Sequence, residues 1–358
     1  MDTLRAIVNT VNGIFGIAND AISGLFAGFL PDWGVEIVKA LLAIVAALLF
    51  LIVVVMLQTW AERRVLGRMQ DRWGPNRVGK FGLLQPVADV VKLLLKEDIR
   101  PNTADPVAHL LAPVIVLIPA LLAFAVIPFG DGMAIADINI GILFVVAIGS
   151  LTTVGIVLAG WGSGNKYSVL GGMRAAAQMV SFEVPLVLAL TGPVLVVGSM
   201  SMGDLVSAQA GFGGLGWMVF AQPVAFAVYL VAGTAEINRS PFDIPEGESE
   251  LVAGFHTEYS GIKWALFFLA EYLNAFALAA IAATVFLGGW QGPLLPPYLW
   301  FVVKAWLLFL AMIWVRATLP RLRVDQLMGF CWKVLVPVAL ANLLLTALGV
   351  SLWQIWRG

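Results

Sequence analysis

Charge is scarce in this 358-residue sequence: 12% of the residues are Asp, Glu, Lys or Arg, and the formal net charge is −1. Soluble domains carry about 25% charged residues, so a soluble enzyme and a disordered scaffold are excluded. A nucleic-acid binder is excluded as well, because it needs a basic face. Cysteine occurs once, at Cys331, which excludes a disulfide framework and an iron–sulfur cluster held by this chain alone. The two histidines, His109 and His256, lie far apart in the sequence and argue against a zinc or haem site.

A polytopic membrane protein remains, since 60% of the residues are hydrophobic. A membrane-spanning helix needs about 20 mostly apolar residues, and open strands would leave their backbone groups unpaired in lipid. We therefore predict an all-α polytopic membrane protein with interfacial amphipathic helices and eight transmembrane helices, at about 37–58, 109–129, 138–160, 171–198, 215–235, 262–289, 298–317 and 332–355. These spans form a single transmembrane domain, 36–358, which follows an N-terminal amphipathic extension, 1–35.

Lys and Arg are concentrated on one side of this predicted topology. The connections after the first, third, fifth and seventh spans carry 17 of the 21 basic residues, and the other three connections carry none. By the positive-inside rule, the basic connections face the cytoplasm or its equivalent. The first basic connection also has an apolar stripe over 82–97, which predicts an amphipathic helix at the membrane surface.

Two carboxyl residues lie inside predicted spans, Glu183 in the fourth and Glu271 in the sixth. An ionisable group within a membrane is costly and is a functional candidate by default. Pro185 leaves the carbonyl of Ser181 without its helical donor, so a bend is expected beside Glu183. Two such groups favour a proton relay, and a buried structural hydrogen-bonding role is the alternative. Lys304, near the start of the seventh span, has two open interpretations, a snorkelling side chain and a buried relay partner.

The connection after the fifth span, 236–258, is acidic although it lies on the predicted basic side. It contains one basic residue, Arg239, and six carboxyl side chains: Glu236, Asp243, Glu246, Glu248, Glu250 and Glu258. Crowded carboxylates raise one another's pKa and can share protons. Apolar residues are interleaved with them, which a free loop would not need. These features favour a proton funnel, with a solvated loop as the alternative.

The segment after the first span, 61–79, combines a basic cluster with a Gly-Pro-Asn turn. Basic residues next to a membrane often bind anionic lipids, but a lipid anchor does not explain the carboxyl group or the turn. We therefore favour a docking surface for other proteins above an apolar cavity. Its candidate residues are Glu62, Arg63, Arg64, Arg72, Pro75, Asn76 and Arg77.

Four motifs occur in order along the chain, and together they resemble one family. They are Glu62-Arg63-Arg64 through Arg72-Trp73-Gly74-Pro75-Asn76-Arg77, Ser181-Phe182-Glu183-Val184-Pro185, the run from Glu236 to Asp243, and the run from Glu248 to Ser260. From about residue 37 to its end, the sequence is similar to the H-type membrane subunits of proton-pumping NADH:quinone oxidoreductase, respiratory complex I, whose mitochondrial counterpart is subunit 1. Some relatives carry a further glutamate in the third span, where this sequence offers Ser150, Thr152 and Thr153.

The resemblance implies one subunit of an enzyme, with no complete active site on this chain alone. It implies a membrane heel that joins the two arms of the complex and forms part of a quinone chamber. It also implies a bacterial inner (plasma) membrane or a mitochondrial inner membrane, with the basic connections facing the cytoplasm or matrix. Quinone would be the substrate, while flavin mononucleotide and the iron–sulfur clusters would belong to partner subunits. The partners would be the peripheral-arm quinone-site subunits and the small and antiporter-like membrane-arm subunits. By resemblance, Arg239 and Asp243 join the docking residues at the chamber, and the proton path comprises Glu183, Glu236, Glu248, Glu250 and Glu271.

Two other functions fit part of the same pattern. The homologous membrane subunit of an energy-converting hydrogenase shares the fold, and the long 61–79 motif favours the quinone enzyme over it. A stand-alone proton-coupled secondary transporter could use the intramembrane glutamates, but such transporters usually carry inverted repeats, and we find no internal repeat in the sequence.

Overall fold

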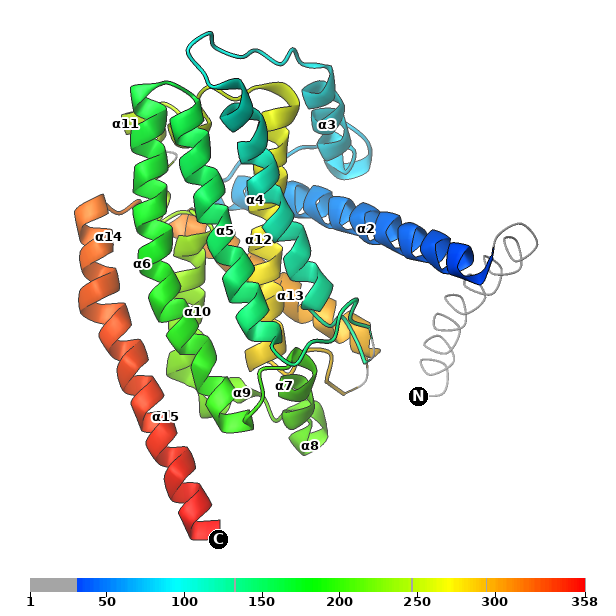
Figure 1. The fold of residues 1–358 in the computed structure, drawn as a ribbon, viewed down its shortest axis with the longest axis vertical. Coiled ribbons are helices and arrows are strands. Elements are labelled where there is room, and N and C mark those ends of the chain that lie inside the picture. Colours follow the sequence, from blue (N-terminus) through cyan, green and yellow to red (C-terminus); the bar gives the residue numbers. More distant parts are fainter. Residues whose placement is uncertain (1–30, 132, 246, 294, 358) are drawn as a thin grey trace.

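Helices account for the regular structure of the described residues, 31–131, 133–245, 247–293 and 295–357 of the computed structural model, and no strand occurs among them. Figure 1 shows a bundle built around α12, with α2 leaning away from it and α15 along the opposite edge. The main helices are α2 (Asp32–Met69), α3 (Gln85–Leu95), α4 (Pro106–Val126), α5 (Gly141–Gly162), α6 (Lys166–Val197), α10 (Pro223–Glu236), α12 (Gly261–Phe286), α13 (Pro297–Thr318) and α15 (Val336–Arg357).

Shorter elements connect these helices. They are the 3₁₀ turns Lys80–Gly82 and Gly254–His256, the helices α7 (Met202–Ala208), α8 (Gly211–Gly214), α9 (Met218–Ala221), α11 (Glu248–Leu251) and α14 (Val324–Phe330), and the π-helical turn Cys331–Leu335. In Figure 1, α3 and α11 lie at one end of the bundle and α7 to α9 at the other. The first and fifth connections, which contain α3 and α11, therefore lie at the same end of the bundle, while the orientation of that end in a membrane stays a prediction.

Seven helices in the described part of the chain are long and apolar enough to cross a membrane, which confirms the all-α polytopic class. They are Trp33–Met69, Pro106–Val126, Gly141–Gly162, Lys166–Val197, Gly261–Phe286, Pro297–Thr318 and Val324–Trp356. The first runs well past the predicted end at about 58, because no proline interrupts it before Met69. Its start at Asp32 also falls inside the predicted 1–35 extension, of which residues 1–30 lie outside the described residues.

The predicted fifth span, 215–235, is divided into two helices. Gln222 leaves the helical conformation with φ −130° and ψ 53°, and α10 begins at Pro223, whose ring nitrogen has no hydrogen to donate. The 14 residues of α10 extend about 21 Å at 1.5 Å per residue, less than the roughly 30 Å hydrocarbon core. The count of eight spans is therefore not confirmed by helix length.

The helix α12 occupies the centre of the bundle and contacts α2, α3, α4, α10 and α13. Its second half is rich in fully buried alanines, including Ala279, Ala280, Ala282 and Ala283. Small side chains allow helices to approach closely, which is how membrane helices gain packing energy. This position places Glu271 of α12 within reach of several other helices.

The predicted amphipathic segment 82–97 forms α3 over Gln85–Leu95. Its apolar residues Val87, Val91, Leu94 and Leu95 are exposed on the isolated chain. An amphipathic helix with an uncovered apolar face suits a membrane surface, and that location stays a prediction.

Candidate functional site: a buried ionic cluster beside two cavities

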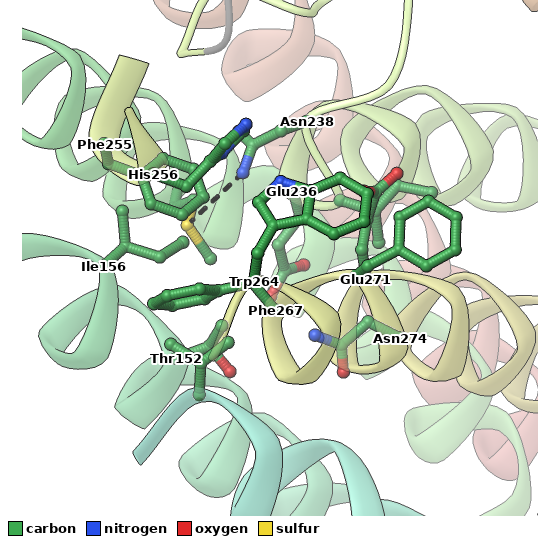
Figure 2. A pocket seen from close by; sticks show the side chains of 14 residues that line it. Thr152, Ile156, Glu236, Asn238, Phe255, His256, Trp264, Phe267, Glu271 and Asn274 are labelled. Atoms are coloured by element: carbon green, nitrogen blue, oxygen red, sulfur yellow. Dashed lines mark hydrogen bonds between the residues drawn. The ribbon is translucent and has the colours of Figure 1, made fainter. Parts of the chain in front are cut away.

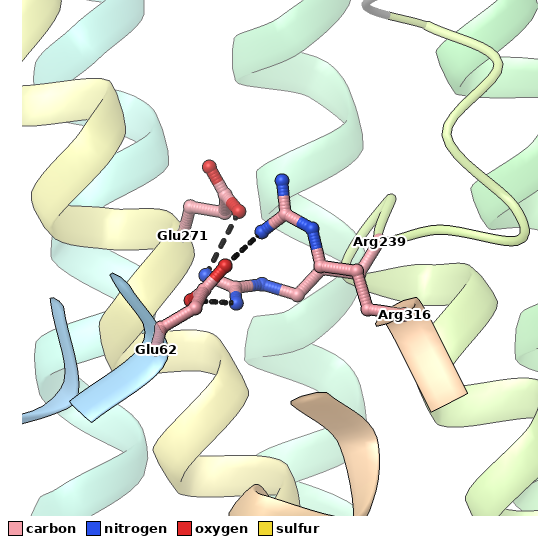
Figure 3. Close-up of polar contacts among 4 residues, drawn as sticks. All are labelled: Glu62, Arg239, Glu271 and Arg316. Atoms are coloured by element: carbon pink, nitrogen blue, oxygen red, sulfur yellow. Dashed lines mark hydrogen bonds and ion pairs between the residues drawn. The ribbon is translucent and has the colours of Figure 1, made fainter. Parts of the chain in front are cut away.

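Four charged side chains from four separate segments meet in the interior, and we call them the ionic cluster: Glu62, Arg239, Glu271 and Arg316 (Figure 3). Arg239 Nη1 donates to Glu62 Oε2 at 2.6 Å, and Arg239 Nη2 lies 3.1 Å from Glu271 Oε1. Arg316 Nη1 donates to the other carboxylate oxygen of Glu62. Two cations thus face two anions. Glu62 and Arg239 are buried, whereas the side chains of Glu271 and Arg316 are 30% and 34% exposed. The charges balance, as the burial of the central pair in a low-dielectric interior requires.

Arg239 is the centre of the ionic cluster. It is only 5% exposed, and its guanidinium carbon lies 4.3 Å from the centre of the Tyr272 ring, a cation–π contact. Burial alone lowers the pKa of Arg239, but the carboxylates of Glu271 and Glu62 more than offset this and raise it above its ordinary value. Arg239 therefore remains charged, and any rearrangement here must move a fixed positive charge.

A tight turn directs Arg239 into the bundle. The helix α10 ends at Glu236, and Asn238 follows with φ 55°, a left-handed conformation that asparagine tolerates better than most residues. Gln178 Nε2 of α6 donates to the carbonyls of Ala235 and Phe242, each at 2.7 Å. Residues on both sides of Arg239 are thus fixed to α6, so its guanidinium points toward α2 and α12.

Two adjoining cavities of about 70 and 80 Å³ lie within the bundle, and the first of them borders the ionic cluster at Glu271. They share five lining residues, among them Glu236, Thr152 and Asn274, and the first is also lined by Glu271 (Figure 2). A water molecule needs roughly 10–15 Å³ of such volume, so each cavity is large enough for several waters. The first cavity therefore joins Glu271 of the ionic cluster to Glu236 through a space whose mostly apolar lining includes carboxyl, amide and hydroxyl groups.

Glu183, predicted to lie in the proton path, is paired with a hydroxyl group. Ser150 Oγ of α5 donates a hydrogen bond to Glu183 Oε1 of α6. Two residues earlier, the carbonyl of Ser181, which Pro185 leaves without its helical donor, accepts a hydrogen bond from Cys331 Sγ at 3.1 Å. The freed carbonyl is thereby satisfied by another helix, and Glu183 sits on an α6 that runs unbroken through Val197.

The second half of the acidic connection is packed closely against α6. An added Cβ on Gly171 would lie 2.7 Å from Gly254 Cα, so only glycine allows this approach. Ser168 Oγ donates to the carbonyl of Phe255 at 2.9 Å. Burial lowers the pKa of His256, which follows, to about 4. This half of the connection is therefore a packed wall of the first cavity, which Phe255 and His256 line, rather than a solvated loop.

The acidic residues nearer the end of the bundle are placed differently. Glu250 is exposed and accepts a hydrogen bond from Arg174 Nη1 at 2.6 Å, which lowers the pKa of that carboxyl. Asp243 is half-buried. The side chain of Glu248 and the whole of Glu246 lie outside what the structure describes. Neither Glu250 nor Asp243 lines the two cavities, so their predicted roles remain untested.

The predicted docking residues form two groups. Glu62 enters the ionic cluster, while Arg63, next to it, pairs with Asp89 of α3. Arg64 Nη1 donates to the carbonyl of Phe81 at 2.8 Å and so closes the turn that leads to α3. The remaining members lie away from the ionic cluster, with Pro75 half-buried and Arg72, Asn76 and Arg77 exposed.

Arg316 and Lys304 were not identified as structural anchors from the sequence. Arg316 lies in the last turn of α13 and was counted only as a basic residue that sets the topology. Lys304 is 3% exposed, and its Nζ donates to the carbonyls of Leu287, Gly289 and Gln291 at 2.6, 3.0 and 2.6 Å. It therefore holds the connection after α12 in place, a role that neither open interpretation named.

Within the described ranges, no three His, Cys, Asp or Glu side chains converge to hold a metal ion.

The family model described as NADH dehydrogenase matches residues 42–347. The chain belongs to the NADH dehydrogenase family. The NADH-quinone oxidoreductase subunit designated H in Dehalococcoides mccartyi (strain CBDB1) is 56% identical over 299 residues, which is 83% of each chain. The subunit of the same name from Geobacillus kaustophilus (strain HTA426) is 54% identical over 82% of this chain and 88% of the relative. The one from Brevibacillus brevis (strain 47 / JCM 6285 / NBRC 100599) is 50% identical over 90% of this chain and 96% of the relative.

These relatives in the NADH dehydrogenase family are subunits of an enzyme complex, which confirms the resemblance inferred from the four motifs. All four motifs fall within the matched residues 42–347. Membership supports a membrane subunit of an enzyme complex, with other subunits as partners.

Proposed function

We propose that this chain is the membrane heel subunit of a proton-pumping NADH:quinone oxidoreductase. It forms part of the quinone chamber and the first part of the acidic path that couples quinone reduction to proton translocation. The names of the relatives support the identity of the enzyme. We place the chain in a bacterial inner or mitochondrial inner membrane, and the concentration of Lys and Arg in alternate connections supports an orientation in which those connections face the cytoplasm or matrix. Quinone is the substrate, and flavin and iron–sulfur clusters reside in partner subunits.

The ionic cluster is the observation that carries this proposal. A buried salt bridge adds little net stability compared with an apolar core, so a four-residue cluster that costs desolvation is explained best by a function. Glu271 belongs both to the ionic cluster and to the wall of the first cavity. A change of charge near Glu62 or Arg239 therefore affects whether the carboxyl group of Glu271, which contacts the cavity, is ion-paired or protonated.

The coupling mechanism follows from this double position. Reduction of a quinone places negative charge in an apolar chamber. This charge must be compensated, either by the positive charge of Arg239 or by the uptake of protons. Movement of Arg239 away from Glu271 leaves that carboxylate unpaired in a low-dielectric site, where it takes up a proton. The proton then passes through the two cavities, which are large enough for several waters, to Glu236 and on to Glu183. The acidic path leads from Glu183 to the antiporter-like subunits.

The exposed part of segment 61–79 supplies the docking surface in this proposal. Arg72, Asn76 and Arg77 are exposed next to the end of α2, whose Glu62 enters the ionic cluster. A partner of the peripheral arm that binds there would close the chamber over the cluster. The ion pair of Arg63 with Asp89 ties α3 to the same surface.

The test is a substitution of Glu271→Gln in the whole complex, reconstituted in liposomes. We expect NADH:quinone reductase activity and proton pumping to fall together by about tenfold or more, because the amide neither pairs with Arg239 as an anion nor carries a proton. The matched control is Glu36→Gln, the same change at an exposed position on α2, which should leave both unchanged. Full pumping by an assembled Glu271→Gln complex would contradict the acidic path.

The complex purified in mild detergent through this tagged chain gives an independent test. It should show the spectroscopic signals of flavin and iron–sulfur clusters and an inhibitor-sensitive NADH:quinone reductase activity. The substitution Glu62→Ala should abolish this activity. A hydrogenase metal centre in that complex would assign the chain to an energy-converting hydrogenase instead.

A further inference from the structure

Two consecutive residues of α5, Gly149 and Ser150, lie against carboxyl groups from two other helices. Ser150 Oγ donates to Glu183 Oε1 of α6. An added Cβ on Gly149 would lie 3.5 Å from Oε1 of Glu236, the last residue of α10, which is ordinary van der Waals contact. Consecutive helical residues point about 100° apart around the axis. The two carboxyl groups therefore lie on adjoining faces of α5, at consecutive positions along it.

The second cavity reaches this part of α5. It is lined by Glu236, Gly149 and Val146, and its volume is about 80 Å³, enough for several waters. The carbonyl of Val146 is also the second acceptor near the Ser150 hydroxyl, at 3.3 Å. The cavity therefore has Glu236 on its wall together with Val146 and Gly149, the residues that accept from and precede Ser150 on α5.

A serine hydroxyl can pass a proton without becoming charged for long, because it has one O–H donor and two acceptor lone pairs. We propose that Ser150 is a proton-relay residue between Glu236 and Glu183, a step that rests on the proposed function. The O–H bond of Ser150 breaks as an O–H bond to the Glu183 carboxylate forms. Ser150 Oγ takes a proton from a cavity water at the same time, and the protonated Glu236 carboxyl returns one to that water. The net change is one proton moved from Glu236 to Glu183.

Ordinary helix chemistry does not account for this contact. Serine in a helix commonly donates to the carbonyl four residues earlier, and Val146 provides that acceptor at 3.3 Å. The hydroxyl is instead shared with a carboxylate of another helix. Thr153 of the same helix provides a natural comparison, since its Oγ1 also faces α6 but contacts Met179 Sδ at 3.8 Å and no carboxyl group.

The experiment compares Ser150→Thr with Ser150→Val in the whole complex reconstituted in liposomes. The two variants have the same shape and differ only in the hydroxyl group. We expect Ser150→Val to pump protons about tenfold more slowly per assembled complex, since it loses a hydrogen bond to a charged group. Ser150→Thr should remain within about twofold of the original protein. Thr153→Val, the same chemical change three residues later, should leave pumping unchanged.

Equal pumping by Ser150→Thr and Ser150→Val would overturn the relay, whether both are normal or both are impaired in fully assembled complex. If neither variant assembles, Ser150→Ala replaces them, and normal pumping by that variant overturns the relay while a tenfold loss supports it. Glu183→Gln separates this inference from the proposed function. Loss of pumping in Glu183→Gln together with normal pumping in Ser150→Val removes only the relay, whereas normal pumping in Glu183→Gln removes the acidic path through Glu183.

Discussion

The pairing of Arg239 with Glu62 can be tested by replacing the arginine with methionine, which keeps an unbranched, flexible stem and removes the charged guanidinium group. The two side chains are 5% and 4% exposed, and their closest atoms are 2.6 Å apart. In the variant Glu62 keeps Arg316, but Glu271 loses its ion pair with Arg239. Removing one partner of a buried pair costs about 3–5 kcal/mol. The equilibrium for unfolding should therefore shift by about two to four orders of magnitude.

The assay is the thermal and detergent resistance of the purified complex, measured for Arg239→Met, Glu62→Gln and the double variant. Because the two residues share one interaction, the double variant should lose less stability than the sum of the single losses. Arg174→Met is the control, since it breaks the exposed pair with Glu250, and exposed pairs are worth about 1 kcal/mol at most. An Arg239→Met complex as stable as the Arg174→Met complex, or strictly additive losses, would refute the reasoning.

Two further predictions concern residues outside the ionic cluster. Burial lowers the pKa of His256 to about 4. The unfolded chain therefore binds a proton at this histidine below about pH 6.5, whereas the folded chain binds it only near pH 4. Stability should fall as the pH drops from about 6.5 toward 4, and His256→Gln should reduce the difference in melting temperature between pH 7 and pH 5; an equal difference in both proteins would refute the assignment. Lys304→Met removes three hydrogen bonds to backbone carbonyls, so we expect about 1–3 kcal/mol lower stability with an unchanged NADH:quinone rate per assembled complex. A lowered rate in fully assembled complex would contradict this purely structural role.

The helical class and most of the spans could be predicted from the sequence because hydrophobic length is a local property. The predicted fifth span was not confirmed, because its main helix begins only at Pro223, a residue whose effect on a helix was available in the sequence. The end of the first span could not be found from hydrophobicity alone. Its helix continues through a charged stretch to Met69, and contacts with α3 and α12 stabilise that stretch.

The candidate site was predicted in part. Three members of the ionic cluster, Glu62, Arg239 and Glu271, were named from motifs and from their cost inside a membrane. Their partner Arg316 was not named, because it is 254 positions from Glu62 and only the crossing of α2 and α13 brings them together. The contact between Ser150 and Glu183 depends in the same way on how α5 packs on α6. A motif identifies residue types that suit a chemistry, but tertiary packing selects their partners.

The close approach of Gly171 to Gly254 has a consequence for natural variation in this chain. A single methyl group at position 171 would collide with the backbone of residues 254 and 255, and it would change neither charge nor hydrogen-bonding capacity. Phe255 and His256, which line the first cavity, would be displaced with that backbone. Defects in energy conversion can therefore arise from added volume alone, at a position with no titratable group. A search for damaging variants that scores only the loss of charged residues would overlook them.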